Sequence, residues 1–347
     1  MKYDIVLVSY NSVRWLEPCV QALSRLDYDL SQLNLVFVDN ASTDDTVNRL
    51  HALKQQYPGF GGFEIVESGK NSGFGAGCNL GAAQGSAPWI FFLNVDTAVD
   101  PRLFFELDQA IEQYPQAGGF ECRQLPYELG HHIDPVTLET SWASGAAFCV
   151  RRVCFEQVNG FDENLFMYCE DVDLSWRIRA TGVPLYYVPR ALVNHYVLER
   201  TPNSAAELRE YTGTCIGTLL LQYKYGSLKQ IIAANRCYLE TLRNPRHFDG
   251  VRRVLLKEYL NHFKRLWSFL LWRKKDRRLF QAVNSEKIQA AQRVEKGFEA
   301  ERGRFVLEKP VKSGPMFSVV VRTCSRPASL RKTLCSLRHQ TYRNFEI

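Results

Sequence analysis

The first 100 residues alternate between short apolar stretches and stretches with the spacing of an amphipathic helix. Four apolar stretches are rich in β-branched and aromatic residues: 4–10, 33–39, 63–68 and 89–94. Three stretches with helical spacing separate them: about 13–26, 43–57 and 74–84. Nearly continuous apolar character over six or seven residues is typical of strands buried on both faces of a parallel sheet. The order predicts a doubly wound α/β fold, a mostly parallel sheet flanked by helices.

Composition places this sheet in an ordinary globular protein. Of 347 residues, 46% are apolar and 23% are charged, so the chain can bury a large core. No run of 18 apolar residues is present, and the N-terminus lacks the features of a signal peptide. The ten cysteines are scattered, without a C-x-x-C pair or a zinc-like spacing. This pattern is typical of reduced thiols, and we expect a cytoplasmic protein.

Polar or glycine-rich residues follow each of the four predicted strands. These residues are Ser9, Tyr10 and Asn11 after the first strand, Asp39 after the second, Asn71, Gly73 and Phe74 after the third, and Asn94 and Asp96 after the fourth. Ligands of doubly wound sheets bind outside the carboxyl ends of the strands. We therefore expect these side chains to form one ligand-binding edge.

Two of these carboxylates suit different ligands. Asp96 ends a buried strand, where a carboxylate suits a divalent cation that prefers oxygen ligands. The alternative, a cap for the helix expected after it, fits Asp100 better, because Pro101 stands in the first turn of that helix. Asp39 stands too early to cap its helix, so we expect it to accept a hydrogen bond from a ligand, such as a pyrimidine imide.

The glycine-rich segment at 71–81 leaves two interpretations open. Glycines let a backbone approach a phosphate or a sugar closely. They also let a helix pack closely on a sheet.

The segment at 159–182 contains the predicted base. Glu170 and Asp171 begin a helix, where carboxylates are stabilised in any case. The apolar run ahead of them favours a positioned base over a simple cap. Arg177 could pair with these acids or with phosphates. His195 ends a further predicted strand at 186–196, and this position favours a metal or phosphate ligand.

After residue 205 the pattern becomes helical. Residues 251–280 contain ten Lys or Arg residues and two acidic residues, a net charge of +8, with apolar residues at helical spacing. Two uses are open: peripheral contact with an anionic membrane, or packing on the catalytic domain while the charges are solvated. No motif points to nucleic acid.

The C-terminal stretch resembles the N-terminal one. Residues 308–316 are predicted to be a linker, and 317–347 repeat the strand, polar turn and helix of 6–35. We predict the opening of a second copy of the first domain. The predicted division is 1–205, 206–307, 308–316 and 317–347.

Six motifs together resemble the inverting family 2 glycosyltransferases, in particular their bacterial rhamnosyltransferase-like branch. They cover about residues 3–200 and read VSYNS, VDNASTDDT, NSGFGAGCNLG, LNVDT, GFDENLFMYCEDVDLSWRIRATG and VNH. One departure is Val95, where the family often has proline. The resemblance implies a GT-A fold followed by a helical extension, and makes 317–347 the start of a second GT-A module without metal and base motifs.

The resemblance also implies roles. Asp39 would bind the nucleotide base, and Asp96, with Asn94 beside it and His195 assisting, would hold Mg²⁺ or Mn²⁺ on the diphosphate. Asp171, with Glu170 beside it, would deprotonate the acceptor hydroxyl. The other residues expected to bind the donor are Ser9, Tyr10, Asn11, Asn71, Gly73, Phe74 and Arg177. The reaction would move a sugar from a UDP- or dTDP-sugar to a glycan or lipid-linked glycan in bacterial surface polysaccharide synthesis, at the inner face of the membrane.

Two other functions are alternatives for this sequence. A sugar-phosphate nucleotidylyltransferase would need a glycine-rich basic loop after the first strand, and the residues there contain no glycine. A non-catalytic binding or scaffold module is the second alternative. Asp96, Asp171 and His195 argue against it, because a scaffold has no need of them.

Overall fold

The structure is a computed structural model. It describes residues 1–126, 131, 133–134, 137–196, 204–246, 248–275, 277–283, 316–321, 327–338 and 344–347. Residues 284–307 of the expected helical region and almost all of the linker expected at 308–316 lie outside the described residues.

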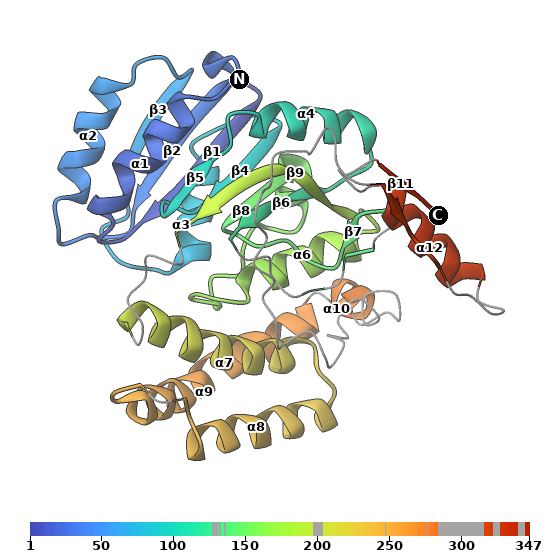
Figure 1. The fold of residues 1–347 in the computed structure, drawn as a ribbon. Helices are drawn as coiled ribbons and strands as arrows, with labels where there is room; N and C mark the ends of the chain where they lie inside the picture. The colour runs from blue at the N-terminus through green and yellow to red at the C-terminus, as the bar shows by residue number, and fades with distance from the viewer. Residues whose placement is uncertain are drawn as a thin grey trace.

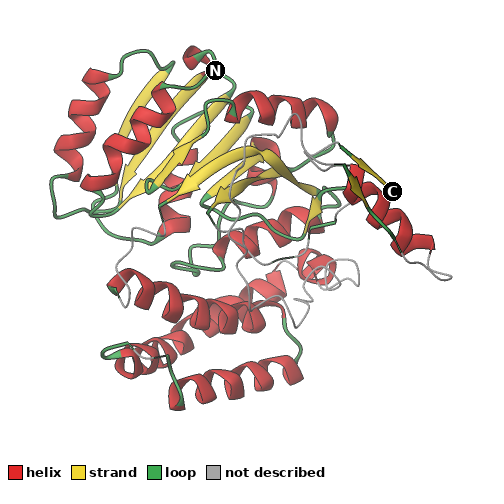
Figure 2. Ribbon diagram, in the orientation of Figure 1, coloured by secondary structure: helices red, strands yellow, loops and turns green. Residues whose placement is uncertain are grey.

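One mixed sheet forms the centre of the first domain (Figures 1 and 2). Its strands among the described residues are β1 (Tyr3–Ser9), β2 (Leu33–Asp39), β3 (Gly62–Glu67), β4 (Trp89–Leu93), β5 (Thr97–Val99), β6 (Gly119–Leu125), β7 (Glu139–Thr140), β8 (Ala147–Arg151) and β9 (Leu185–His195). Their order is β3-β2-β1-β4-β8-β6-β9-β5, with β7 on β9. The first four strands are mutually parallel, and β8 runs antiparallel to both of its neighbours. This is the predicted α/β fold of GT-A type.

Helices cover both faces of the sheet, as Figure 2 shows. They are α1 (Val13–Ser24), α2 (Thr46–Gln56), α3 (Phe74–Ala82), α4 (Leu103–Gln113), α5 (Arg152–Gln157) and α6 (Glu170–Ala180). Residues such as Ile5 and Leu7 face α1, α2 and α4, while Val6 and Phe92 face α3, α5 and α6. Because successive strand residues point to opposite faces, both faces must be apolar, and this explains the continuous apolar runs.

A helical extension follows, on the side of α3 and α6 (Figure 1). It comprises α7 (Ala205–Tyr225), α8 (Leu228–Arg243), α9 (Val251–Lys275) and α10 (Arg277–Val283). These helices share a third apolar core with Leu165 and Trp176 of the first domain. Within the described residues, no helix is both long and apolar enough to cross a membrane.

The C-terminal residues form a small separate sheet (red in Figure 1). β10 (Phe317–Ser318) and β11 (Phe345–Glu346) pair in parallel, and α12 (Pro327–Arg338) stands between them in the chain.

Residues 97–99 depart from the expectation of a helix directly after Asp96. They form β5, which pairs antiparallel with the end of β9, and α4 begins only at Leu103. Asp100 is not the cap of α4, whose cap position is Arg102; its carboxylate instead accepts the Arg102 N–H at 2.9 Å in the turn before the helix. The β-branched residues at 97 and 99 are buried in this short pairing, which local periodicity does not predict.

The glycines of α3 serve close packing at two positions. A Cβ at Gly77 would lie 2.9 Å from a methyl of Val8, and one at Gly81 would lie 2.5 Å from a methyl of Val6. α3 therefore sits directly on β1, and for these two glycines the packing interpretation holds.

This packing gives a stability prediction. Gly81→Ala should lower the free energy of unfolding by about 1–3 kcal/mol, because the added methyl overpacks the contact with Val6 even though alanine favours a helix. Urea unfolding measures the change. Gly59→Ala is the control, since a Cβ there meets only Leu30 at 3.8 Å. Equal stability of the two variants would contradict close packing of α3.

Candidate active site

The carboxyl ends of β1 and β2 bring Asp39 beside Ser9, its register partner. Asp39 is buried, and its Oδ2 accepts the Ser42 N–H at 2.9 Å. The loops after the two strands are joined by Asn11, whose Oδ1 accepts the Thr43 N–H at 2.7 Å. Tyr10, which stands between Ser9 and Asn11 in the chain, is exposed at this edge. A rigid polar edge with one exposed ring results, but donor binding by these residues stays a prediction.

Asn40, which the sequence analysis did not single out, connects this edge to the glycine-rich segment. Its Nδ2 donates to Asn71 Oδ1 at 3.1 Å and to the Gly73 carbonyl at 3.0 Å. The side chain of Asn40 is buried, and its bond to the Gly73 carbonyl is shielded from water, whereas the bond to Asn71 is only partly buried. The segment that starts α3 is thereby held against β2. In the sequence, Asn40 is marked only by its position after Asp39, which does not distinguish it from any asparagine in a loop.

Asp96 and His195 face each other across the β5–β9 pair. Thr97 is the register partner of His195, and His195 Nε2 lies 3.3 Å from Asp96 Oδ1. The other ring nitrogen, Nδ1, lies 3.1 Å from Gln124 Oε1 on β6. An amide oxygen is an acceptor, so it favours the tautomer with the proton on Nδ1 and leaves Nε2 as an acceptor towards Asp96. A carboxylate oxygen and an imidazole nitrogen are both ligand types that divalent cations accept.

The loop before β8 links this pair to Asp171. The Asn94 N–H donates to the Ala146 carbonyl at 3.0 Å, and the Gly145 N–H donates to Asp171 Oδ2 at 3.0 Å. The same loop therefore contacts the turn that carries Asp96, through Asn94, and contacts Asp171 directly. The convergence of Asp39, Asp96 and Asp171 at one edge follows from the order β2-β1-β4-β8.

Glu170 and Asp171 are adjacent carboxyl groups in different surroundings. Asp171 accepts N–H bonds from Gly145 and from Val172, whereas Glu170 Oε2 is buried and finds no hydrogen-bond partner among the described residues. Burial and then the charge of Asp171 raise the pKa of Glu170 well above its usual value. Burial also raises the pKa of Asp171, and its N–H donors oppose the rise. The surroundings thus favour the negative charge on Asp171 over Glu170, because Asp171 has N–H donors and Glu170 Oε2 has none among the described residues.

The apolar run before α6 holds these acids in place. Tyr168 and Cys169 both have a left-handed φ of 69°, which turns the chain sharply into the helix. The Phe166 carbonyl accepts the Phe74 N–H at 2.9 Å. A Cβ at Gly73, whose φ is 93°, would lie 2.1 Å from that carbonyl oxygen, so only glycine fits.

Arg177 is not brought to this edge. It is buried on α6, where its Nε donates to Asp173 Oδ2 at 2.8 Å and its Nη1 donates to the carbonyls of Val158 and Gly160. These contacts join α6 to the loop after α5. They favour a structural role, and binding of the donor by Arg177 stays a prediction that nothing in the geometry supports.

Residues 4–133 match the family described as glycosyl transferase family 2. The N-acetylglucosaminyl-diphospho-decaprenol L-rhamnosyltransferase of Mycobacterium tuberculosis is 29% identical over 248 residues, which cover 58% of this chain and 78% of that protein. Rhamnosyltransferase WbbL of Escherichia coli is 49% identical over 55 residues, 16% of this chain and 21% of that protein. The chain is a glycosyltransferase.

Its fold also has a solved relative. The mannosyltransferase PcManGT from Pyrobaculum calidifontis, in complex with GDP-Man and Mn²⁺, superposes with a TM-score of 0.56 at 16% identity and covers 81% of this chain and 85% of that chain. At this identity the likeness shows the fold alone. The glycosyltransferase therefore has a GT-A-like fold followed by a helical region.

The environment of Glu170 gives a pH prediction. In the folded transferase the pKa of Glu170 lies well above 4.5, the ordinary pKa of a glutamate, which applies in the unfolded chain. The stability from this proton is fully present below that value and is lost as the pH rises through the raised pKa. Glu170→Gln, which is neutral at every pH, should therefore melt about 2–4 °C higher than the parent at pH 8.

The difference should shrink as the pH falls to 5, measured as thermal unfolding midpoints across this range. Glu163→Gln is the control, because Glu163 is exposed. A difference in melting temperature that does not change with pH would mean that the surroundings do not raise the pKa of Glu170.

Proposed function

We propose that this glycosyltransferase moves a sugar from a nucleotide diphosphate donor, with inversion, to a hydroxyl of a lipid-linked glycan in bacterial surface polysaccharide synthesis. One observation carries the proposal: the loop before β8 connects the Asp96–His195 pair to Asp171. Its Ala146 carbonyl accepts the Asn94 N–H, and its Gly145 N–H donates to Asp171. The two similar rhamnosyltransferases support a deoxyhexose donor such as a dTDP- or UDP-sugar, and the name of the mycobacterial protein supports a diphospho-lipid acceptor.

Donor binding is assigned to the edge after β1 and β2. Asp39 would accept from the nucleotide base, with Ser9 and Asn11 shaping the loops around it. Tyr10 offers an exposed ring for stacking. Asn71, Gly73 and Phe74 would contact the donor through the start of α3, although the Phe74 N–H is already used within the protein.

A divalent cation fits the group formed by Asp96 and His195. The carboxylate and the imidazole Nε2 face each other at 3.3 Å, and Gln124 orients the ring from behind. Such a support is typical of histidine ligands to metals. Asn94 would assist from the same turn. Bound there, Mg²⁺ or Mn²⁺ would supply charge stabilisation for the departing diphosphate.

Asp171 is proposed as the general base. It carries the negative charge of its pair, and its raised pKa brings it closer to the working pH, where a base is most effective. The acceptor hydroxyl gives its proton to the Asp171 carboxylate as its oxygen attacks C1 of the donor sugar, and the nucleotide diphosphate leaves on the opposite side. Glu170 stays neutral, so it does not compete for the proton.

Residues 317–347 are proposed to open a second module of the same kind. The parallel β10–β11 pair with α12 between its strands repeats the β1–α1–β2 unit, in which β1 and β2 are also parallel. The family match itself covers only residues 4–133.

Asp171→Asn tests the proposed base. Turnover of a dTDP- or UDP-deoxyhexose onto a lipid-linked glycan should fall by about 10²–10⁴, because the amide cannot take the proton. Donor affinity, measured by isothermal titration, should change little. Asp249→Asn is the matched control, an exposed aspartate on the loop before α9. Comparable turnover in Asp171→Asn would remove this residue from the mechanism.

Gln124→Ala tests the proposed metal site without removing a ligand. Loss of the support of His195 should weaken Mn²⁺ affinity in the presence of nucleotide by about 10–100-fold. Titration of the Mn²⁺ electron paramagnetic resonance signal measures it. Gln56→Ala on α2 is the control, an exposed glutamine far along the chain from this group. Unchanged Mn²⁺ affinity would mean that His195 does not bind the metal.

A further inference from the structure

One face of α9 is apolar, exposed and continuous. The exposed apolar residues of this helix are Leu256, Leu260, Phe263, Trp267, Leu270 and Leu271. Their spacing of four, three, four and three residues places the first five in one stripe along the helix. Trp267 is 70% exposed and Leu260 is 59% exposed, so the stripe is not a partly covered core. We call these six residues the α9 stripe.

The opposite face of α9 is already used. Val251, Leu255 and Phe269 are buried in the third core. The hydroxyl of Tyr238 on α8 donates a hydrogen bond to the Leu255 carbonyl oxygen at 2.9 Å. α9 is therefore fixed on α7 and α8, and its stripe faces away from them. A helix that only packed within its own chain would not need a second apolar face.

Basic residues surround the stripe. Arg253 and Lys274 lie on its own line, seven residues before Leu260 and seven after Trp267, and Lys257 and Lys275 lie beside it, all exposed. Within α9 the only acidic residue is Glu258. Cations at both ends and along one side make the surface complementary to a negatively charged partner.

A second copy of the chain fits this surface poorly. In a parallel pair of α9 helices Arg253 would meet Arg253, and in an antiparallel pair it would approach Lys274. Both arrangements place like charges together at the ends of the contact. An anionic lipid surface has no such conflict, because aromatic and leucine side chains enter the boundary between headgroups and acyl chains while cations contact the headgroups.

We propose that α9 lies in the plane of an anionic lipid bilayer and inserts the α9 stripe into it. Trp267 and Phe263 sit at the depth of the headgroups, where amphipathic aromatic rings are favoured. Arg253, Lys257, Lys274 and Lys275 contact phosphate groups of the lipids. The proposal holds whichever acceptor the enzyme uses, and so goes beyond the proposed function.

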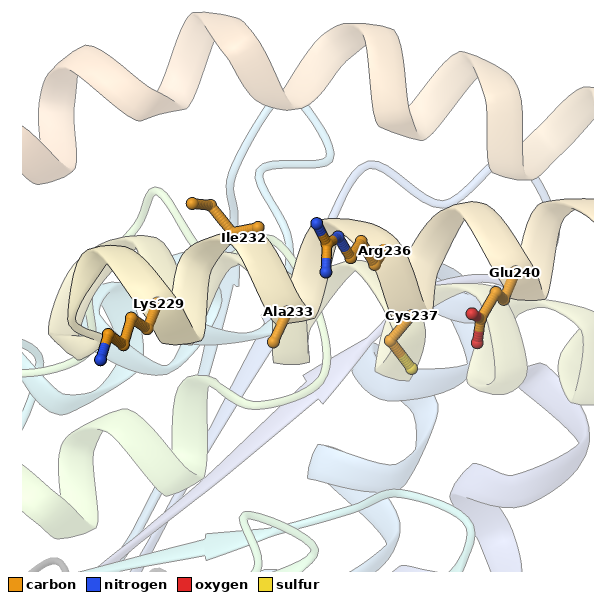
Figure 3. A pocket seen from close by; sticks show the side chains of 6 residues that line it. All are labelled: Lys229, Ile232, Ala233, Arg236, Cys237 and Glu240. Carbon is orange, nitrogen blue, oxygen red and sulfur yellow. The ribbon is translucent and has the colours of Figure 1, made fainter.

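The outer face of α8 is the less suitable surface. Figure 3 shows the shallow pocket there, which is lined only by α8 residues. Ile232 and Arg236 point to one side of the helix, and Ala233 and Cys237 point to the other. Glu240 adds a negative charge, and α8 exposes three large apolar residues, Leu228, Ile232 and Leu239, against six on α9. The α8 face therefore lacks the continuous stripe that insertion requires.

Vesicle sedimentation of the full chain tests the proposal. The protein should bind phosphatidylcholine vesicles that contain phosphatidylglycerol and should bind pure phosphatidylcholine far less. Binding should weaken as salt is raised, because exposed charges are screened. Leu260→Ser combined with Trp267→Ser should lower the partition coefficient at least about tenfold, since two large apolar side chains no longer leave water.

A matched pair of single variants separates the stripe from general stickiness. Phe263→Ser in the stripe should lower binding severalfold, and Phe105→Ser on α4 should not. The two rings have similar exposure, 49% and 43%. Lys257→Glu should weaken binding only to vesicles with phosphatidylglycerol. Unchanged melting temperatures and unchanged transfer to a water-soluble acceptor would show that fold and active site remain intact.

Three results would overturn the proposal. The first is no binding to phosphatidylglycerol vesicles at low salt. The second is equal loss in Phe263→Ser and Phe105→Ser. The third is a dimer in light scattering that the Leu260→Ser and Trp267→Ser pair abolishes, since a second copy would then cover the stripe. Failure of the proposed function has a different signature, because it would remove transfer and leave vesicle binding unchanged.

Discussion

The antiparallel insertion of β8 between β4 and β6 is the constraint on which the candidate active site depends. Because β8 runs against β4, its first residue, Ala147, pairs with Leu93, the last residue of β4. The loop before β8 therefore lies at the carboxyl edge of the sheet, where its backbone holds Asn94 on one side and Asp171 on the other. A parallel strand in this place would deliver its opposite end to the edge, and the link would be absent. One bond of this link joins two backbone groups, and the other joins the Gly145 N–H to the Asp171 carboxylate.

The helical extension supports the same site from behind. On α7, a Cβ at Gly213 would lie 2.2 Å from the Tyr168 ring, and one at Gly217 would lie 2.7 Å from the Tyr168 carbonyl oxygen. This close approach fixes the left-handed residues that lead into Glu170 and Asp171. The extension thus packs directly against the segment that positions the proposed base.

A buried charge network fastens the two parts. Lys224 of α7 lies 2.6 Å from both Asp162 and Asp173, and Tyr225 donates to Asp173 at 2.6 Å. Arg177 completes the set around Asp173. Burying these charges costs free energy unless every member is paired, so removal of one partner leaves an uncompensated charge in the core. The network makes the docking of the extension specific in position, while the apolar contacts of the third core supply most of the favourable free energy.

The sequence predicted the elements that depend on local pattern. The first four strands, α1 to α3, α6 and β9 are found within a few residues of the expected ranges, because periods of two and 3.6 are read from neighbours along the chain. β5 was not predicted, since three residues show no period and their structure comes from pairing with β9. The same holds for single contacts. Asn40 and Gln124 act through partners far away in the chain. Arg177, expected to pair with Glu170 and Asp171 or with phosphates, instead contacts Asp173 in the interior.

The positive charge of the helical extension contrasts with the charge of the rest of the chain. Residues 251–280 have a net charge of +8, while the full chain has +6, so the remainder is slightly acidic. α9 concentrates positive charge outside the candidate active site, and a negative surface would attract the molecule by this helix. Since α9 is fixed to α7 and α7 to the loop before Asp171, such attraction would orient the catalytic domain as a rigid unit. Orientation of this kind follows from packing and charge alone, without a membrane-spanning helix or a change of conformation.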